Sequence, residues 1–136
     1  MRDNIGILTL GVDDLERSLK FYRDGLGLPS RGLVGTEFEH GTVALFDLQG
    51  NMLLSLYPRG DLALDAKVKA AVPSPAEFSI GHIVGSKAEV DAVMREAERA
   101  GATITDPAHN RPWGVYSGYF QDPDGHLWEI VWDPDL

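Results

Sequence analysis

Residues 119–129 read Tyr-Phe-Gln-Asp-Pro-Asp-Gly-His-Leu-Trp-Glu, two strand-like runs separated by a turn sequence. Proline at the second turn position and glycine at the fourth suit a type I turn. The flanking segments, 115–121 and 126–132, are rich in aromatic and branched residues, which favours strands. The stretch therefore predicts a β-hairpin near the end of the chain.

The segment before this hairpin predicts a strand, a helix and a second, short strand. Residues 78–84 are apolar enough for a strand. Ser86 and Glu89 form a capping box at the start of a helix that Gly101 ends. Residues 103–105 can form the short strand.

The first half of the chain repeats this order. Residues 5–12 predict a strand, Asp13 or Asp14 caps a helix, and 42–48 with 51–57 predict a hairpin.

Two landmarks indicate duplication of one structural unit. The expected helix starts, Asp13 and Ser86, and the hairpin glycines, Gly50 and Gly125, are separated by nearly the same length of chain. The proline-containing segment 58–77 between the halves predicts a linker with one helical stretch, 62–72.

Composition limits the kind of protein. A chain of 136 residues with 43% hydrophobic residues fits one globular domain, 1–136. Twelve basic against 21 acidic residues, a net charge of −9, argue against a nucleic-acid or anionic-membrane partner. The absence of cysteine excludes disulfides and thiolate chemistry. No apolar run is long enough for a membrane span or a signal peptide, so we expect a cytoplasmic protein.

Two motifs resemble one family. Residues 12–22, Val-Asp-Asp-Leu-Glu-Arg-Ser-Leu-Lys-Phe-Tyr, with 26–28, Leu-Gly-Leu, resemble the opening signature of the vicinal-oxygen-chelate superfamily. Residues 113–114, Trp-Gly, with 119–129 resemble its closing hairpin. This superfamily contains glyoxalases, bleomycin-resistance proteins and extradiol dioxygenases. The resemblance covers nearly the whole chain except the linker.

The resemblance implies an α+β fold of two βαβββ modules. Module one would span about 1–57 and module two about 78–136, joined by the linker 58–77. Their curled mixed sheets would form a cup that holds a small molecule, with the helices on the outside. The resemblance also implies a homodimer.

The resemblance also raises the question of a divalent metal. Family enzymes commonly offer a histidine on the first strand and a carboxylate on the last strand of each half. The matching positions here are Ile7, Leu54 with Ser55 beside it, Ser79 or Ile80, and Glu129. Only Glu129 is a strong ligand, so we expect no usual metal centre. His82 lies two or three residues after the ligand position on the first strand of the second half. A change of register would be needed for it to bind a metal together with Glu129.

Glu129 is notable without any family argument. It lies between Leu127 and Val131 on a strand that is apolar on both faces, which predicts partial burial. Burial would raise its pKa and suit a general acid or base. The alternative is a structural carboxylate that accepts hydrogen bonds from a tyrosine or the backbone. His82, if it faces the cup, could be its acid–base or metal-binding partner; otherwise it is a packed structural histidine.

Side chains near the hairpin could line a ligand pocket. The expected ligand-binding residues are Trp113, Tyr116, Tyr119, Phe46, Tyr57 and Arg111. Tyr116 and Tyr119 have opposite parity, so at most one faces the cup in a regular strand. Each aromatic ring could instead pack in the core, and Arg111 could lie in a solvated loop rather than meet an anionic ligand. His126 is expected to be an exposed hairpin residue, and His40 and His109 are expected to lie in loops without a functional role.

Three functions fit these observations. The first is a bleomycin-resistance-like protein that binds a small, cationic or aromatic molecule around Glu129 without chemistry. The second is a metal-dependent glyoxalase-like lyase or dioxygenase that uses Glu129 and His82, with a metal-free lyase or isomerase as a variant. The third is a structural dimer with a vestigial cup.

Overall fold

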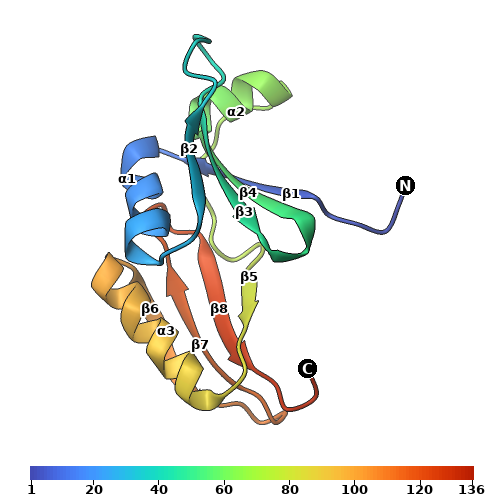
Figure 1. The fold of residues 1–136 in the computed structure, drawn as a ribbon, viewed down its shortest axis with the longest axis vertical. Helices are drawn as coiled ribbons and strands as arrows, with labels where there is room; N and C mark the ends of the chain where they lie inside the picture. Colours follow the sequence, from blue (N-terminus) through green and yellow to red (C-terminus); the bar gives the residue numbers. More distant parts are fainter. The chain divides into compact units, whose positions relative to one another are not determined.

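The computed structural model describes residues 1–136, which form two compact units, Met1–Val72 and Pro73–Leu136 (Figure 1). Each unit contains its own four-stranded mixed sheet, and neither sheet closes on itself. The strand orders are β1-β4-β3-β2 and β5-β8-β7-β6, so the first strand of each unit lies beside its last. The shared order confirms the predicted α+β class and the duplicated βαβββ unit.

In the first unit, one helical segment connects the first two strands and a second helix follows the last strand. Its elements are β1 (Ile7–Val12), α1 (Leu15–Lys20), the π-helical turn η1 (Phe21–Gly25), β2 (Ser30–Val34), β3 (Val43–Leu48), the 3-10 turn η2 (Gln49–Asn51), β4 (Met52–Pro58) and α2 (Arg59–Ala66). Tyr22 of η1 packs edge-on against Phe46 of β3, with ring centroids 6.1 Å apart, and both rings are fully buried. This contact fixes the helical segment on one face of the sheet.

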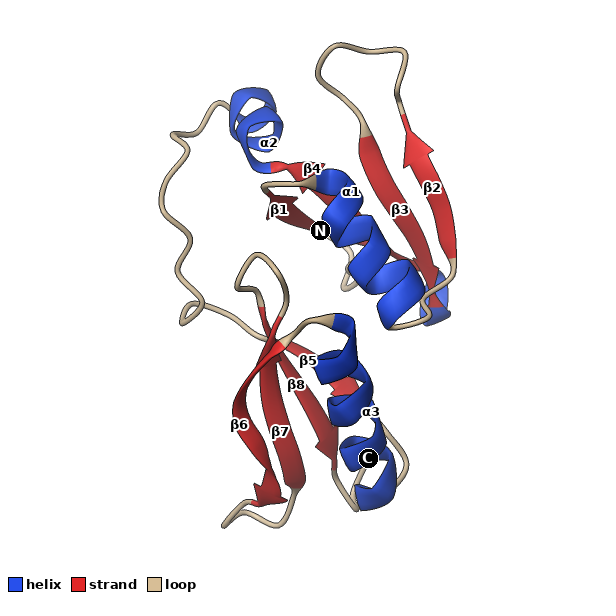
Figure 2. Cartoon of the chain, turned by 90° about the vertical axis from the view of Figure 1, so that its left-hand side faces the viewer, coloured by secondary structure: helices blue, strands red, loops and turns tan.

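The second unit carries a single long helix along one face of its sheet (Figure 2). Its elements are β5 (Ile80–Ile83), α3 (Lys87–Ala100), β6 (Thr103–Asn110), β7 (Tyr116–Gln121) and β8 (Leu127–Trp132). The buried side chains of α3 are Val90, Met94 and Ala97, and those of the strands are Phe120, Trp128 and Ile130. The Phe120 and Trp128 rings stack with centroids 6.1 Å apart. Burying each large apolar side chain stabilises the unit by roughly 1.5–3 kcal/mol.

Both helix starts follow the sequence-based expectation. Asp14 Oδ1 accepts a hydrogen bond from the Arg17 amide at 3.0 Å, and Ser86 Oγ accepts one from the Glu89 amide at 3.1 Å. The Glu89 carboxylate reaches back one residue further than in a standard capping box, to the Gly85 amide at 3.0 Å. Gly101, with φ 109°, ends α3 in the left-handed conformation.

Three elements differ from the sequence-based expectation. β2 was not predicted, because its polar residues and Gly32, which has φ 75°, hide the alternation of a strand. β6 runs past Thr105 to Asn110, and its pairing is interrupted around Asp106, so no regular two-residue period is visible. α2 begins at Arg59 and ends before Lys67, which adopts φ 57°, whereas the sequence predicted residues 62–72.

None of the helices combines the length and apolar character that crossing a bilayer requires.

The close approach of β6 and β7 at Gly118 gives a stability prediction. A Cβ atom there would lie 3.0 Å from the Ala108 amide nitrogen and 2.8 Å from Met94 Cε. We expect Gly118→Ala to lower the free energy of unfolding by about 1–3 kcal/mol. The added Cβ would clash with the Ala108 backbone, which cannot move aside as a flexible side chain could. Urea denaturation measures the change.

Gly81→Ala on β5 is the matched control, because nothing lies within 4 Å of its added Cβ. Equal stability of the Gly118 and Gly81 variants would contradict the close approach.

Candidate functional site

Strand β8 sorts its side chains between two faces of the second sheet. Trp128 and Ile130 are buried beneath α3, so Leu127, Glu129 and Val131 lie on the other face. We call this the distal face; β7 contributes Ser117 and Tyr119 to it, through the pairs Ser117↔Val131 and Tyr119↔Glu129. Glu129 is half-buried there.

Tyr119 is the hydrogen-bond partner of Glu129 on the distal face. The two residues are paired across β7 and β8, and the Tyr119 hydroxyl donates to the Glu129 carboxylate. Burial raises the pKa of the Tyr119 phenol, and the charge and hydrogen bond of Glu129 raise it further. The phenol therefore keeps its proton at neutral pH and donates a hydrogen bond to the carboxylate.

Arg111 lies over the ring of Tyr119. Its Cζ lies 5.3 Å from the centroid of the Tyr119 ring. Nε donates to Ser117 Oγ at 2.9 Å, one terminal nitrogen to Asp106 Oδ2 at 2.7 Å and the other to the Ser117 carbonyl at 3.1 Å. All three guanidinium nitrogens thus donate hydrogen bonds within the unit.

Asp106 completes the polar chain. Its carboxylate accepts from Arg111 and lies 3.1 Å from His109 Nε2. The hydrogen bond from Arg111, followed by that from His109, lowers the pKa of Asp106. Asp106, Arg111, Tyr119 and Glu129 therefore form one connected series across β6, β7 and β8.

A hollow of about 360 Å³ adjoins this series. Its lining residues are Ala76, Glu77, Phe78, Ser79, Thr105, Tyr119 and Leu127. Leu127 and Tyr119 place the hollow on the distal face. The lining combines apolar surface, three hydroxyl groups and one carboxylate, and it contains no lysine or arginine.

His82 does not join Glu129 in the second sheet. β5 and β8 run parallel, with Gly81 opposite Glu129 and His82 opposite Ile130. Paired residues of neighbouring strands share a face, so His82 lies on the α3 face and Glu129 on the distal face. The register therefore places the two members of the acid–base or metal-binding pair considered from the sequence on different faces of the sheet.

Tyr116 also lies on the α3 face. Its hydroxyl donates to Asp91 of α3 at 2.6 Å, and the Lys87 ammonium lies 5.6 Å from the centroids of the Tyr116 and Trp132 rings. The hydrogen bond to Asp91, then burial, raises the pKa of Tyr116. Tyr116 thus holds α3 on the sheet and does not line the hollow, whereas Tyr119 does.

The remaining expected wall residues are not among the residues that line the hollow. Trp113 is 72% exposed, in the connection between β6 and β7. Phe46 is fully buried against Tyr22 in the first unit and is unavailable to a ligand. Tyr57 lies on β4 of the same unit, where burial and the charges of Asp65 and Asp61 raise its pKa.

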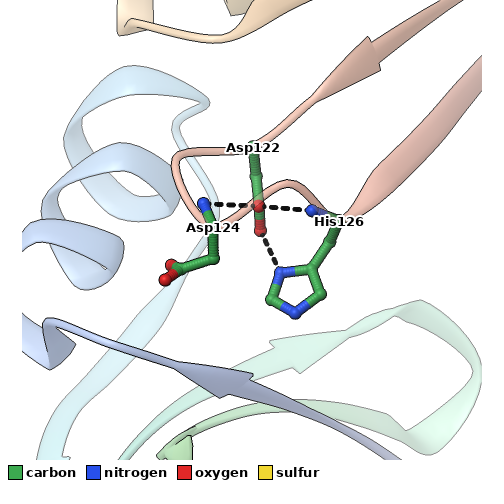
Figure 3. Close-up of side chains that lie close together, drawn as sticks. All are labelled: Asp122, Asp124 and His126. Carbon is green, nitrogen blue, oxygen red and sulfur yellow. Dashed lines mark hydrogen bonds and ion pairs between the residues drawn. The ribbon is translucent and has the colours of Figure 1, made fainter. Parts of the chain in front are cut away.

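A cluster that sequence reasoning missed lies at the β7–β8 turn (Figure 3). The ligand atoms of Asp122, Asp124 and His126 lie within 4.8 Å of one another, close enough to hold a cation. Asp122 Oδ1 accepts the amides of Asp124 at 2.9 Å and His126 at 2.8 Å, and Oδ2 lies 2.7 Å from His126 Nδ1. These bonds explain the turn without an ion.

His126 was expected to be an exposed hairpin residue, and that expectation was wrong. Its side chain is 12% exposed, and the Asp122 carboxylate that it meets is fully buried. The spacing Asp-x-Asp-Gly-His was the available signal, because an aspartate that starts a turn commonly accepts the amides that follow it. His40 lies in a loop, as expected, whereas His109 lies on β6; both are exposed.

Known proteins are similar to this chain in sequence and in fold. The model of the Glyoxalase/Bleomycin resistance protein/Dioxygenase superfamily matches residues 4–130, so the chain belongs to this superfamily. The uncharacterized protein YraH of Bacillus subtilis is 31% identical over 126 residues, which cover 90% of this chain and 93% of YraH. Virulence protein STM3117 of Salmonella typhimurium is 27% identical, over 94% of this chain and 83% of that protein.

Solved structures agree with the architecture. A glyoxalase-related enzyme from Fulvimarina pelagi has a TM-score of 0.84 at 30% identity, covering 98% of this chain and 90% of that chain. Lactoylglutathione lyase from Agrobacterium tumefaciens has a TM-score of 0.71 at 26% identity, covering 97% and 95%.

The metal centre implied by the family does not fit the residues present. Of the positions matching the family's ligands, Ile7 and Leu54 carry no donor, and Leu54 is fully buried. Ser79 is a weak ligand, which leaves Glu129 alone. On the distal face, the strand neighbours of Glu129 are Tyr119 and Gly81, and neither is a histidine or carboxylate.

The role of Asp122 in the turn can be tested by stability. We expect Asp122→Ala to lower the free energy of unfolding by about 2–4 kcal/mol, because two amides and a ring nitrogen lose their buried acceptor. Thermal and urea denaturation measure the loss. Asp135→Ala, at an exposed position, should change little; a similarly small loss in Asp122→Ala would show that the turn does not need this carboxylate.

Proposed function

We propose that this protein binds a small molecule in the hollow beside Glu129, through an apolar or aromatic body and a cationic or hydrogen-bond-donating group. The observation that carries the proposal is that Tyr119 lines a hollow of about 360 Å³ while its hydroxyl bonds the half-buried Glu129 on the neighbouring strand. That volume lies within the roughly 300–1,000 Å³ of ligand pockets.

The charges around the hollow favour a cation or neutral donor over an anion. Glu77 lines the hollow, and Glu129 adjoins it through Tyr119. Arg111, which lies over the Tyr119 ring, is neutralised by Asp106 and donates its other hydrogen bonds to Ser117. The net charge of −9 acts in the same direction at long range.

The apolar part of the ligand would rest on Phe78 and Leu127. Phe78 is 53% exposed, and both residues line the hollow. The hydroxyls of Ser79 and Thr105 are also in the lining, where they could orient polar substituents. Apolar walls with a few placed polar groups are the usual composition of a binding site.

An enzyme is the second candidate, and the pairing of a carboxylate with a phenol favours it. Such a pair can accept a proton at Glu129 and donate one at Tyr119. The names of the Fulvimarina pelagi and Agrobacterium tumefaciens proteins are those of enzymes. Turnover of an added ligand, as opposed to stoichiometric binding, would favour this second candidate.

The binding proposal is tested with a matched pair of probes, 2-phenylethylamine and 3-phenylpropionate. We expect titration with the amine to shift the backbone amide NMR signals of residues that line the hollow, namely Ser79, Thr105, Tyr119 and Leu127. Titration with 3-phenylpropionate should leave these signals unchanged. Glu129→Gln should weaken amine binding about tenfold or more, since a charge-assisted hydrogen bond contributes roughly 1.5–3 kcal/mol.

Glu98→Gln is the matched control, because it removes the same charge from an exposed position of α3. It should leave amine binding unchanged. Equal binding of the two probes, or an equal loss in the Glu129 and Glu98 variants, would contradict the proposal.

Metal analysis separates the binding proposal from a metal-dependent enzyme. For protein purified without chelators, we expect iron, manganese, nickel and zinc well below one ion per chain, because Glu129 lacks partner ligands. Inductively coupled plasma mass spectrometry measures this content. Stoichiometric metal that disappears in Glu129→Ala would contradict the expectation and favour the enzyme.

A further inference from the structure

We propose that Arg111 is the positioning residue of the Glu129 site: it clamps the Tyr119 ring so that the phenol hydroxyl stays directed at the Glu129 carboxylate. This inference rests on the proposed function for its biological meaning, but its geometry belongs to the second unit alone.

The clamp begins with the way Arg111 is held. Its side chain is 11% exposed, and its guanidinium spans Asp106 on β6 and both polar groups of Ser117 on β7. A planar group held at three nitrogens has one orientation, which a lysine ammonium could not reproduce. The connecting loop is fixed as well, by hydrogen bonds from the Arg111 amide to Val115 at 2.8 Å and from the Gly114 amide to Arg111 at 3.1 Å.

The held guanidinium then acts on Tyr119. Ser117 and Tyr119 are two residues apart on β7 and share the distal face. A guanidinium bonded to Ser117 therefore lies beside the next side chain on that face, and its Cζ is 5.3 Å from the Tyr119 ring centroid. This stacking limits where the ring can turn, and the hydroxyl at its far end meets Glu129.

The charge of Arg111 also acts on the Tyr119 phenol. A cation above a phenol stabilises the phenolate form, so Arg111 lowers the pKa of Tyr119 and partly offsets the effects of burial, Glu129 and Asp106. A more acidic phenol is a stronger hydrogen-bond donor. Arg111 thereby strengthens the bond between Tyr119 and Glu129 without contacting a ligand itself.

Arg111 and the hydrophobic core of the second unit lie on different faces of the sheet. The core of the unit lies on the α3 face, among Phe120, Trp128, Ile130 and the buried residues of α3. Arg111 lies on the distal face, and its contacts are polar groups of the site and the Tyr119 ring. Removing it should alter the site more than the core.

The test is the titration of Tyr119, followed by NMR of ¹³Cζ-labelled tyrosine without any ligand, with the signal assigned by Tyr119→Phe. We expect Arg111→Met to shift the pKa of Tyr119 upward, since the stabilising cation is lost. Arg111→Lys should shift it upward as well, because the ammonium cannot stack on the ring while bonding Ser117 and Asp106. Having two variants keeps the test decisive if one of them does not fold.

Arg95→Met, at an exposed position of α3, is the control and should leave the Tyr119 titration unchanged. An unaltered Tyr119 pKa in a folded Arg111 variant would overturn the positioning role. Because no ligand is present, failure here is distinct from failure of the binding proposal, which the amine titration tests.

Discussion

The register of β8 between β5 and β7 is the constraint on which the site depends. Side chains alternate between the faces of a sheet, so a shift of one residue would exchange every group on β8 between α3 and the distal face. Burial of Trp128 and Ile130 under α3 opposes that shift, because it would expose both and bury the Glu129 carboxylate in the apolar core. The hydrophobic core thus determines where the only acidic side chain of β8 points.

The distal face shows how a half-buried carboxylate is accommodated. Glu129 receives a hydrogen bond from Tyr119, the Arg111 guanidinium stacks on the Tyr119 ring, and Arg111 is neutralised by Asp106. Each polar group meets another, so the series avoids the cost of unpaired buried charge. The arrangement leaves a carboxylate–phenol pair beside a hollow, which is the chemistry that a ligand with a donor group would recognise.

Sequence reasoning reached the fold because its signals were local: helix caps at Asp14 and Ser86, turn glycines and strand-like runs. It also singled out Glu129, from its aliphatic neighbours, and required Tyr116 and Tyr119 to lie on opposite faces. It left open which face His82 occupies, because the register between parallel strands joined through a distant connection leaves no mark in either strand. The clamp by Arg111 depends on the irregular pairing of β6 around Asp106, which no periodicity reveals.

The most direct test of this account is the pattern of nuclear Overhauser effects from the Glu129 side chain in the isolated protein. The register places the Glu129 methylene protons beside the Tyr119 ring and on the opposite face from the His82 ring. The account therefore requires cross-peaks between Glu129 and Tyr119 and none between Glu129 and His82. Cross-peaks to His82 in place of Tyr119 would show that the strand register, and with it the proposed site, is wrong.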